Sequence, residues 1–276
     1  MSAARPLAAP LDSRPLLRLR GVDKTYANGT HALQGLDLDI RPGEFVSLLG
    51  PSGCGKSTAL RLMAGLGEPS AGVIDWPGSR YDARGKPERE LGFVFQDATV
   101  MPWATVADNV YLPLRLQDRP RAEVAERVAE VLALVGLSRF GEAYPRELSG
   151  GMRMRVSIAR ALVTQPKLLL MDEPFAALDE ITRHRLSDDL LAIRERVGCT
   201  VVFVTHSVYE SVYLSSRIIV LAARPGRIVG EIGIDEPYPR RGFRLVQAYA
   251  KHCAAVSGLL EEAMRQGGEP DEENEA

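Results

Sequence analysis

Four residues near the start of the chain, Gly50, Gly55, Lys56 and Ser57, have types and spacings that suit phosphate binding. They fit the pattern G-x-x-x-x-G-K-[ST] within GPSGCGKST, residues 50–58. In such a loop the glycines let successive backbone N–H groups turn toward an anion, and the following helix N-terminus adds its positive dipole end. The Lys56 amine can meet the β- and γ-phosphates, and the Ser57 hydroxyl can bind Mg²⁺. The predicted nucleotide-binding residues of this loop are Gly50, Pro51, Ser52, Gly53, Cys54, Gly55, Lys56, Ser57 and Thr58.

The segments on either side of this loop supply the context that the pattern needs. The apolar run over residues 45–49 predicts a buried strand, and residues 58–66 predict a helix. The alternative is a glycine-rich strand-to-helix turn without a ligand. At average residue frequencies the pattern arises by chance about once in a hundred sequences of this length. Because the flanking elements also fit, the sequence predicts nucleoside triphosphate binding.

A second element, residues 168–173, is an apolar strand that ends in Asp172 and Glu173. This arrangement fits a Walker B motif, in which Asp172 holds hydrated Mg²⁺. A carboxylate at Glu173 would point toward the γ-phosphate, where it can orient and deprotonate the attacking water. An acidic helix start after a strand is the ordinary alternative, but the phosphate loop in the same chain favours the nucleotide interpretation.

A third element, residues 148–152 (LSGGM), places Ser149, Gly150 and Gly151 before a basic helix. A serine and two glycines at a helix N-terminus form a second anion cup, unless they are only an ordinary serine cap. One cup suffices for a nucleotide, so the second needs its own explanation. Here the sequence resembles the ATP-binding subunits of ABC transporters, whose signature is LSGG. The resemblance implies that two chains dimerise head to tail, each signature closing over the other chain's γ-phosphate.

The remaining motifs of that family follow in order over residues 17–232. By this resemblance, Tyr26 stacks on adenine and Gln96 contacts Mg²⁺ and the water. Asp179 belongs to the D-loop at the dimer interface, and His206 is the switch histidine that hydrogen-bonds the γ-phosphate. Each has an ordinary alternative as a loop or exposed residue, but their order and spacing favour function. The resemblance therefore gives Glu173, His206 and Gln96 catalytic roles, and it gives the metal to Ser57, Gln96 and Asp172.

Three stretches, residues 95–110, 148–162 and 205–228, resemble the ATPases of nitrate, sulfonate and taurine importers. Met154 stands where these ATPases commonly have a glutamine, so the resemblance does not establish one contact near the signature. The apolar segment VMPW, residues 100–103, corresponds to the groove that receives a short cytoplasmic helix of the membrane subunit in such importers. Exposed Met and Trp side chains suit a partner helix, and core packing is the alternative.

Composition limits the other possibilities. The chain has 276 residues, of which 45% are hydrophobic and 25% charged, and a net charge of −2 gives no general attraction to nucleic acid. No apolar run approaches the length needed to cross a bilayer. Three widely spaced cysteines, Cys54, Cys199 and Cys253, favour free thiols in a reducing compartment. Oxidation of Cys54 would block nucleotide binding; the alternative is a small residue tolerated in the loop.

Long apolar strands alternate with helices, as in a sheet covered on both faces. The predicted fold class is α/β: a P-loop NTPase (ABC ATPase) core with a β-rich N-terminal part and an inserted helical subdomain. Helical periodicity from Leu245 to Met264 predicts a further helix. The expected domains are a disordered leader (1–15), the ATP-binding domain (16–232) with a helical insert (about 97–162), a helical extension (233–266) and an acidic disordered tail (267–276).

Together these features predict the ATP-hydrolysing subunit of an ABC importer for a small solute, with ATP and Mg²⁺ as cofactors. Its expected partners are a second copy, an integral membrane permease and, indirectly, an extracytoplasmic solute-binding protein, but no nucleic acid. The expected location is the cytoplasmic face of the inner membrane, as a peripheral subunit. The alternatives are a soluble non-transport ABC ATPase, which would call for a coiled-coil insertion, a second cassette or a basic face, and an exporter ATPase. A P-loop small-molecule kinase has no use for LSGG or His206.

Overall fold

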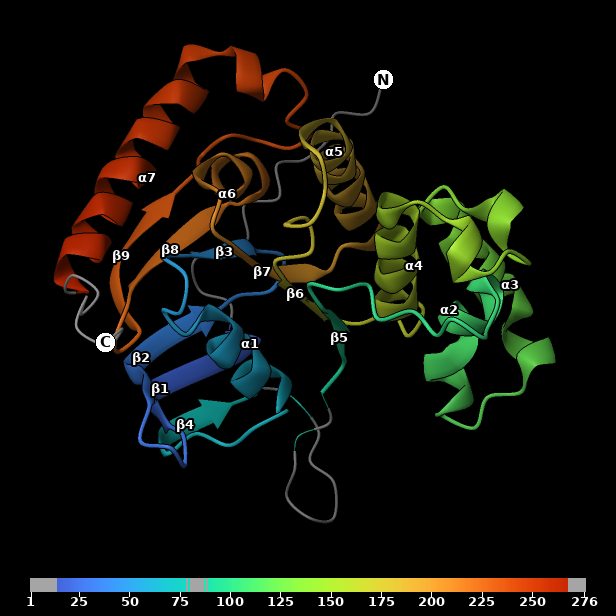
Figure 1. The fold of residues 1–276 in the computed structure, drawn as a ribbon, viewed down its shortest axis with the longest axis horizontal. Helices are drawn as coiled ribbons and strands as arrows, with labels where there is room; N and C mark the ends of the chain where they lie inside the picture. The colour runs from blue at the N-terminus through green and yellow to red at the C-terminus, as the bar shows by residue number, and fades with distance from the viewer. Residues whose placement is uncertain (1–13, 78, 80–86, 88, 268–276) are drawn as a thin grey trace, which may run out of the picture. The chain divides into compact units, whose positions relative to one another are not determined.

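The computed structural model describes residues 14–77, 79, 87 and 89–267. The predicted leader (1–15) and acidic tail (267–276) fall almost wholly outside the described residues. The chain forms two compact units: unit 1 is Met1–Pro87 with Phe203–Ala276, and unit 2 is Glu88–Val202. Figure 1 labels the helices and strands of both units.

Unit 1 contains an antiparallel sheet of three strands in the order β2-β1-β4. In a second group of strands, β3 pairs in parallel with β8, and β8 pairs antiparallel with β9. The elements of unit 1 are β1 (Leu17–Thr25), β2 (His31–Ile40), β3 (Phe45–Leu49), α1 (Lys56–Ala64), β4 (Ala71–Asp75), the end of β7 (Thr200–Thr205), α6 (Val208–Leu214), β8 (Arg217–Ala222), β9 (Arg227–Gly233), η3 (Phe243–Leu245) and α7 (Gln247–Gln266).

Strand β3 leads directly toward the glycine loop, and each of its five residues is buried. Its sequence, FVSLL, lacks the polar alternation of a strand with one wet face, which explains why it lies in the interior. Its polar residue, Ser47, is satisfied by a hydrogen bond to Ser215. A buried strand thus supports the start of the loop and fixes its position.

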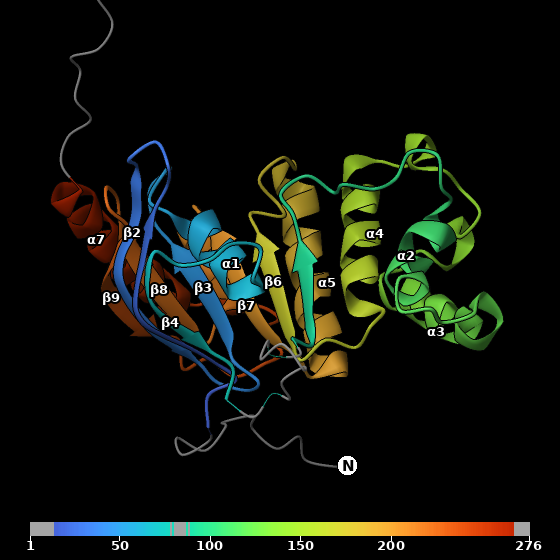
Figure 2. The same cartoon turned by 90° about the horizontal axis from the view of Figure 1, so that it is seen from below.

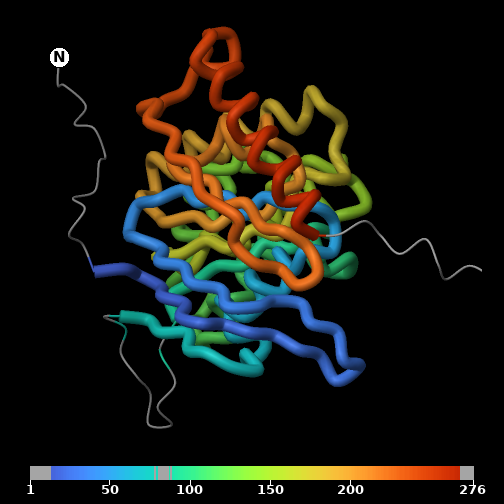
Figure 3. The backbone as a smooth tube through the Cα atoms, turned by 90° about the vertical axis from the view of Figure 1, so that its left-hand side faces the viewer, coloured from blue at the N-terminus to red at the C-terminus, as the bar shows by residue number. Residues whose placement is uncertain are grey.

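Helix α7 packs along β8 and β9 (Figure 3), and its buried residues are Tyr249, Cys253, Val256 and Ala263. The predicted helical start at Leu245 is wrong: α7 begins at Gln247, and the Leu245 side chain is 90% exposed. The preceding Val246 has extended backbone dihedrals, so the periodic pattern is interrupted there. Phe243 fills the buried position instead, with its ring centroid 5.2 Å from that of Tyr249.

Between β5 and β6 of unit 2, all the described regular elements are helical. Strand β5 pairs in parallel with β6, and helix α4 lies between β5 and the pair α2 and α3 (Figure 2). A Cβ added at Gly92 would lie 2.5 Å from the Ala161 carbonyl oxygen, so only glycine permits this close approach of α4 to β5. The elements of unit 2 are β5 (Leu91–Val94), α2 (Val106–Arg115), α3 (Arg121–Leu134), η1 (Ser138–Phe140), η2 (Pro145–Glu147), α4 (Gly150–Leu162), β6 (Leu168–Asp172), α5 (Glu180–Val197) and the start of β7.

Helix α3 has the apolar face that its sequence predicts, with Val124, Val128, Val131 and Leu132 all buried. The limits expected for the helical insert (97–162) and for the C-terminal extension (233–266) stay predictions about domain boundaries.

Candidate nucleotide-binding site

The glycine loop of unit 1 joins β3 to α1 and has the geometry of an anion cup. Gly53 and Gly55 have φ angles of 74° and 88°, in the left-handed region that favours glycine. A Cβ added at Gly55 would lie 2.5 Å from the Ala32 carbonyl oxygen, and one at Gly50 would lie 2.6 Å from that of Leu221. Backbone conformation therefore requires glycine at 53 and 55, and close packing requires it at 50 and 55. These requirements fix the path of the loop backbone.

Lys56 is the first residue of α1, and its side chain is only 5% exposed. Its Nζ donates hydrogen bonds to the carbonyl oxygens of Gly50 at 2.8 Å and Pro51 at 2.9 Å. The ammonium group thus contacts the backbone oxygens of the same loop that is expected to bind the phosphates. A bound phosphate would offer stronger, charged acceptors to the same group.

Cys54 is buried beneath the loop, with its Sγ 3.8 Å from the Lys56 Nζ. Burial raises the pKa of the Cys54 thiol, and the opposing effect of the nearby Lys56 charge is smaller. A protonated, buried thiol is a poor nucleophile. The structure therefore favours a small buried residue in the loop over a redox switch at Cys54.

Tyr26 lies just after β1 and is 41% exposed. Its hydroxyl is 3.1 Å from the Thr58 Oγ1 at the start of α1, and the Lys24 Nζ lies 5.4 Å from the centre of its ring. The aromatic ring is thus next to the phosphate loop, where the sequence resemblance places the adenine contact.

His206 is exposed and directly follows β7. The turn around it is fixed by hydrogen bonds of its neighbours. The Thr205 hydroxyl donates to the Glu210 carboxylate at 2.6 Å and accepts the Ser207 N–H at 3.0 Å. The Ser207 Oγ in turn caps α6 by accepting the Glu210 N–H at 3.3 Å. His206 therefore projects from a well-defined strand-to-helix turn.

In unit 2 the acidic pair lies at the end of β6. Asp172 is buried at the last position of the strand, and Glu173 is partly exposed just beyond it. Glu173 has a φ angle of 43°, in the left-handed region that a non-glycine residue rarely adopts. Such backbone strain clusters at functional sites, which agrees with the catalytic role expected for Glu173.

The signature residues lie at the start of α4, where the Ser149 Oγ accepts the Met152 N–H at 3.2 Å. Asp179 caps the neighbouring helix α5 in the same way, its Oδ1 accepting the Thr182 N–H at 2.9 Å. This hydrogen bond lowers the pKa of the Asp179 carboxyl. A Cβ added at Gly151 would lie 2.9 Å from the Thr182 Cγ2, so Gly151 lets the two helix N-termini approach closely. Their positive dipole ends lie side by side.

Gln96 is exposed beyond β5, and the segment that follows it is held by two residues that the sequence analysis missed. Arg160 of α4 donates to the Thr99 carbonyl oxygen at 2.9 Å and to the Thr99 hydroxyl at 2.8 Å. Asn109 of α2 is fully buried; its side chain accepts the Met101 N–H at 2.7 Å and donates to the Thr105 carbonyl oxygen at 2.9 Å. Arg160 carries no local sequence signal, because its partner lies 61 positions earlier in the chain, whereas the partners of Asn109 lie four and eight positions earlier.

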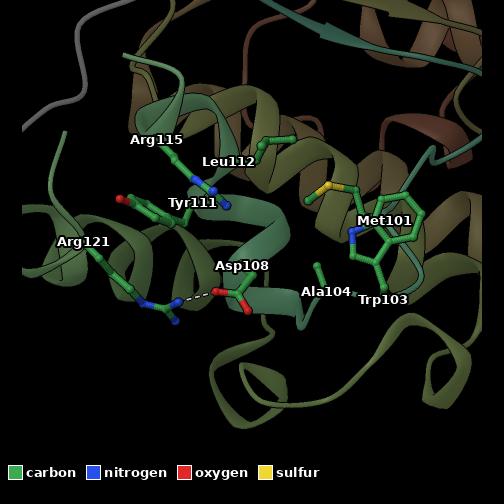
Figure 4. Close-up of a pocket in the computed structure, with 8 residues that line it drawn as sticks. All are labelled: Met101, Trp103, Ala104, Asp108, Tyr111, Leu112, Arg115 and Arg121. Atoms are coloured by element: carbon green, nitrogen blue, oxygen red, sulfur yellow. Dashed lines mark hydrogen bonds and ion pairs between the residues drawn. The ribbon is translucent and has the colours of Figure 1, made fainter. Parts of the chain in front are cut away.

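The VMPW segment borders a pocket of about 410 Å³ in unit 2 (Figure 4). Trp103 is 77% exposed, which excludes core packing for this side chain. Figure 4 shows Met101 and Trp103 facing the α2 residues Tyr111 and Arg115 across the pocket. The pocket residues are Met101, Trp103, Ala104, Asp108, Tyr111, Leu112, Arg115 and Arg121, with an ion pair between Asp108 and Arg121.

The structure thus brings Tyr26, the loop and His206 into unit 1, and Gln96, Asp172, Glu173, the signature and Asp179 into unit 2. Among the described residues, no group of three or more His, Cys, Asp or Glu side chains could hold a metal ion. The donors expected for Mg²⁺ are instead a hydroxyl, an amide and a single carboxylate. Hard oxygen donors of this kind, completed by phosphate and water, suit Mg²⁺.

The loop geometry and the strand pattern define a phosphate-binding α/β protein of the P-loop class. A family model described as ABC transporter matches residues 33–176, and the chain belongs to that family. It is an ABC-type ATP hydrolase. The fold class predicted from sequence and the predicted family are both confirmed.

Two curated relatives and one solved structure illustrate the similarity. The nitrate import ATP-binding protein NrtD of Synechocystis sp. is 43% identical over 252 residues, which cover 89% of this chain and 91% of the relative. The aliphatic sulfonates import ATP-binding protein SsuB of Bacillus cereus is 44% identical, covering 80% and 86%. A dimeric ATP-binding cassette in a post-hydrolysis state bound to ADP and Pi is 35% identical, with a TM-score of 0.68, covering 80% of this chain and 99% of that one. The predicted resemblance to nitrate and sulfonate import subunits is confirmed.

Proposed function

We propose that this chain is the ATP-hydrolysing subunit of an ABC importer for a small solute of the nitrate, sulfonate or taurine kind. The observation that carries the proposal is the similarity to nitrate and aliphatic sulfonate import ATP-binding proteins, 43–44% identical over at least 80% of this chain. The complete series of nucleotide motifs in the chain supports the same conclusion.

We assign the nucleotide contacts as follows. Lys56 and the loop N–H groups bind the phosphates, and Tyr26 stacks on the adenine. Glu173 takes a proton from the attacking water, and His206 donates a hydrogen bond to the γ-phosphate. Mg²⁺, when bound, neutralises charge on the phosphates; Ser57, Asp172 and Gln96 would supply its protein oxygen ligands.

Two copies are proposed to bind ATP between the loop of one subunit and the signature of the other. The support in unit 2 is the helix N-terminus at Ser149, whose positive dipole end and exposed serine suit an anion; the neighbouring helix α5 is capped by the Asp179 carboxylate, which carries negative charge. The dimeric cassette that this chain resembles, bound to ADP and Pi, agrees with such an assembly. ATP would close the dimer, and hydrolysis would release it.

The proposed site for the membrane permease is the pocket beside Trp103. Its lining combines apolar surface from Met101 and Leu112 with the charged Arg115, so it suits an amphipathic helix that carries an acidic residue. Within the part of the chain that the structure describes, no helix is long and apolar enough to cross a bilayer. The similarity to import ATP-binding proteins supports a further proposal: a peripheral subunit at the cytoplasmic face of the membrane, with an extracytoplasmic binding protein reached only through the permease.

The decisive experiment is a pull-down with the Glu173→Gln protein and ATP from detergent-solubilised membranes of the source organism. We expect a multi-spanning permease to co-purify. A double variant, Glu173→Gln with Trp103→Ala, should lose most of that partner while still binding ATP, because the substitution lies outside the nucleotide contacts. Recovery of soluble or nucleic-acid partners without a membrane protein would refute the importer proposal and favour a non-transport ABC ATPase. Recovery of an export permease would refute the proposed import direction and leave the role as a transporter ATPase intact.

A further inference from the structure

Helix α6 has seven residues and begins two residues after His206. A helix this short is not stable by its intrinsic propensity, so tertiary contacts decide where it lies. Many of those contacts come from residues 238–249, the segment that leads into α7 and its first turn. Figure 1 shows α6 next to α7, within the same unit.

Arg240 is the centre of these contacts. Its side chain is 2% exposed, although an arginine is rarely buried without partners. Its guanidinium lies over the rings of Tyr238, at 4.4 Å, and Phe243, at 5.5 Å. The same group donates hydrogen bonds to five backbone carbonyl oxygens: those of Val212 (3.0 Å), Tyr213 (2.9 Å), Ser215 (2.8 Å), Ile234 (3.3 Å) and Glu236 (3.0 Å).

These hydrogen bonds satisfy the C-terminal end of α6. A helix leaves its last four carbonyl oxygens without intrahelical partners. Arg240 supplies donors to two of them, on Val212 and Tyr213, and the Tyr238 hydroxyl donates to a third, on Leu214, at 2.6 Å. The C-terminal segment is therefore the cap of α6.

The N-terminal half of α6 is also held from the C-terminal segment. The Tyr249 hydroxyl in α7 donates to the Tyr209 carbonyl oxygen at 3.0 Å. Burial raises the pKa of Tyr249, so its hydroxyl remains a donor throughout the physiological range. Tyr209 lies only three residues after His206, and the hydrogen bonds among Thr205, Ser207 and Glu210 link the intervening turn to α6.

We propose that Arg240, together with Tyr238 and Tyr249, positions His206 by fixing both ends of α6. The C-terminal segment of the chain thereby acts on the turn from which the histidine meets the γ-phosphate. This inference rests on the proposed role of His206. None of the three residues touches the nucleotide in this account; they act through α6.

The test uses the full chain with histidines labelled for NMR. There are four histidines in the sequence, so each ring resonance can be assigned by substitution. In a Glu173→Gln background, which retains bound ATP, the His206 resonance should shift when MgATP is added. His31 and His184, on β2 and α5, serve as references when variants are compared in the same nucleotide state; His252 does not, because its ring lies near Phe243.

Tyr238→Phe and Tyr249→Phe each remove one hydrogen bond and keep the ring. We expect each to shift or split the His206 resonance while the two references stay fixed. In the otherwise wild-type protein, each should lower kcat about 2- to 10-fold, the effect of one lost hydrogen bond, with the KM for ATP unchanged. Arg240→Gln should have a larger effect of the same kind; if it does not fold, the two tyrosine variants decide the question.

Arg227→Gln is the matched control. It removes a hydrogen bond of 3.1 Å from an arginine to the Gln266 carbonyl oxygen, at the far end of α7, and should alter neither the His206 resonance nor kcat. If His206 responds to MgATP but does not change in the tyrosine variants, the positioning role is refuted and the proposed function stands. If the His206 resonance does not change when MgATP is added to the Glu173→Gln protein, the assignment of the histidine itself fails.

Discussion

The two units differ in how they present the groups expected to meet ATP. In unit 1 the phosphate loop packs closely against its own chain: Lys56 is buried, and added Cβ atoms at Gly50 and Gly55 would touch neighbouring backbone. In unit 2 the signature residues Ser149 and Gly150 are exposed at a helix end, and Asp179 is exposed at another.

This difference indicates which half can bind a nucleotide by itself. A loop whose backbone is fixed before binding loses little conformational freedom when the phosphate arrives. Exposed helix N-termini, by contrast, attract an anion but do not enclose one. We therefore expect unit 1 to determine ATP affinity in the single subunit and unit 2 to determine turnover in the dimer. Substitutions in each unit test this division.

Glu173→Gln should lower turnover by about 10²- to 10⁴-fold, the usual contribution of a general base. The substitution removes the proton acceptor but keeps the shape of the side chain, so ATP binding should be unchanged. The measurements are phosphate release and equilibrium nucleotide binding. Glu180→Gln, at an exposed position in the first turn of α5, is the control and should hydrolyse ATP normally. Wild-type turnover in the Glu173 variant would remove this residue from the mechanism.

Lys56→Met should weaken ATP binding by about 10- to 150-fold. A hydrogen bond to a charged group contributes about 1.5–3 kcal/mol, and methionine keeps only the apolar stem of the side chain. The test is a fluorescence titration with MgATP of the single subunit at low protein concentration. The exposed Lys251→Met in α7 should bind as the wild type does. An unchanged dissociation constant in the Lys56 variant would contradict the division between the units.

Gly151→Ala should destabilise unit 2 and lower turnover, because the added methyl group would lie 2.9 Å from the Thr182 Cγ2. Overpacking of this kind costs about 1–3 kcal/mol. Nucleotide binding to the single subunit should not change. Urea unfolding and phosphate release provide the two measurements.

The chain offers a rescue for this variant. Thr182→Ser removes the Cγ2 methyl group and keeps the backbone N–H that Asp179 accepts. The double variant, Gly151→Ala with Thr182→Ser, should regain most of the stability and turnover. If it does not, the close contact between α4 and α5 is not the reason for glycine at this position.

Tyr26 should give the smallest effect. Tyr26→Phe keeps the ring and loses the hydrogen bond to Thr58, so ATP affinity should change by less than about 3-fold. Tyr26→Ala also loses the stacking surface and should weaken binding by about 2- to 10-fold. A comparison of ATP with inorganic triphosphate separates the two contributions, since only ATP carries the adenine. An equal loss of affinity for both ligands would show that Tyr26 stabilises the phosphate loop and does not stack on the adenine.

Short motifs and local periodicity were enough to predict several elements from the sequence. The phosphate loop, the acidic pair after β6 and the serine cap of α4 are recognisable because their residues are close together in the chain. Strand and helix positions followed from the same local periodicity, as with the apolar run of β3 and the face of α3. At Leu245 this reasoning failed, because an extended residue interrupts the pattern just before α7.

Residues whose partners are distant in sequence have roles that become clear from the folded chain alone. Arg160 binds the segment around Thr99, 61 positions earlier, and Arg240 binds carbonyl oxygens up to 28 positions earlier. By residue type, an arginine is expected at the surface, so no local pattern predicts that Arg240 is buried at the end of α6. The sequence specifies the chemical groups that meet the nucleotide, because those groups belong to short motifs. The contacts that hold those groups in place depend on long-range packing, and they are visible only in the folded chain.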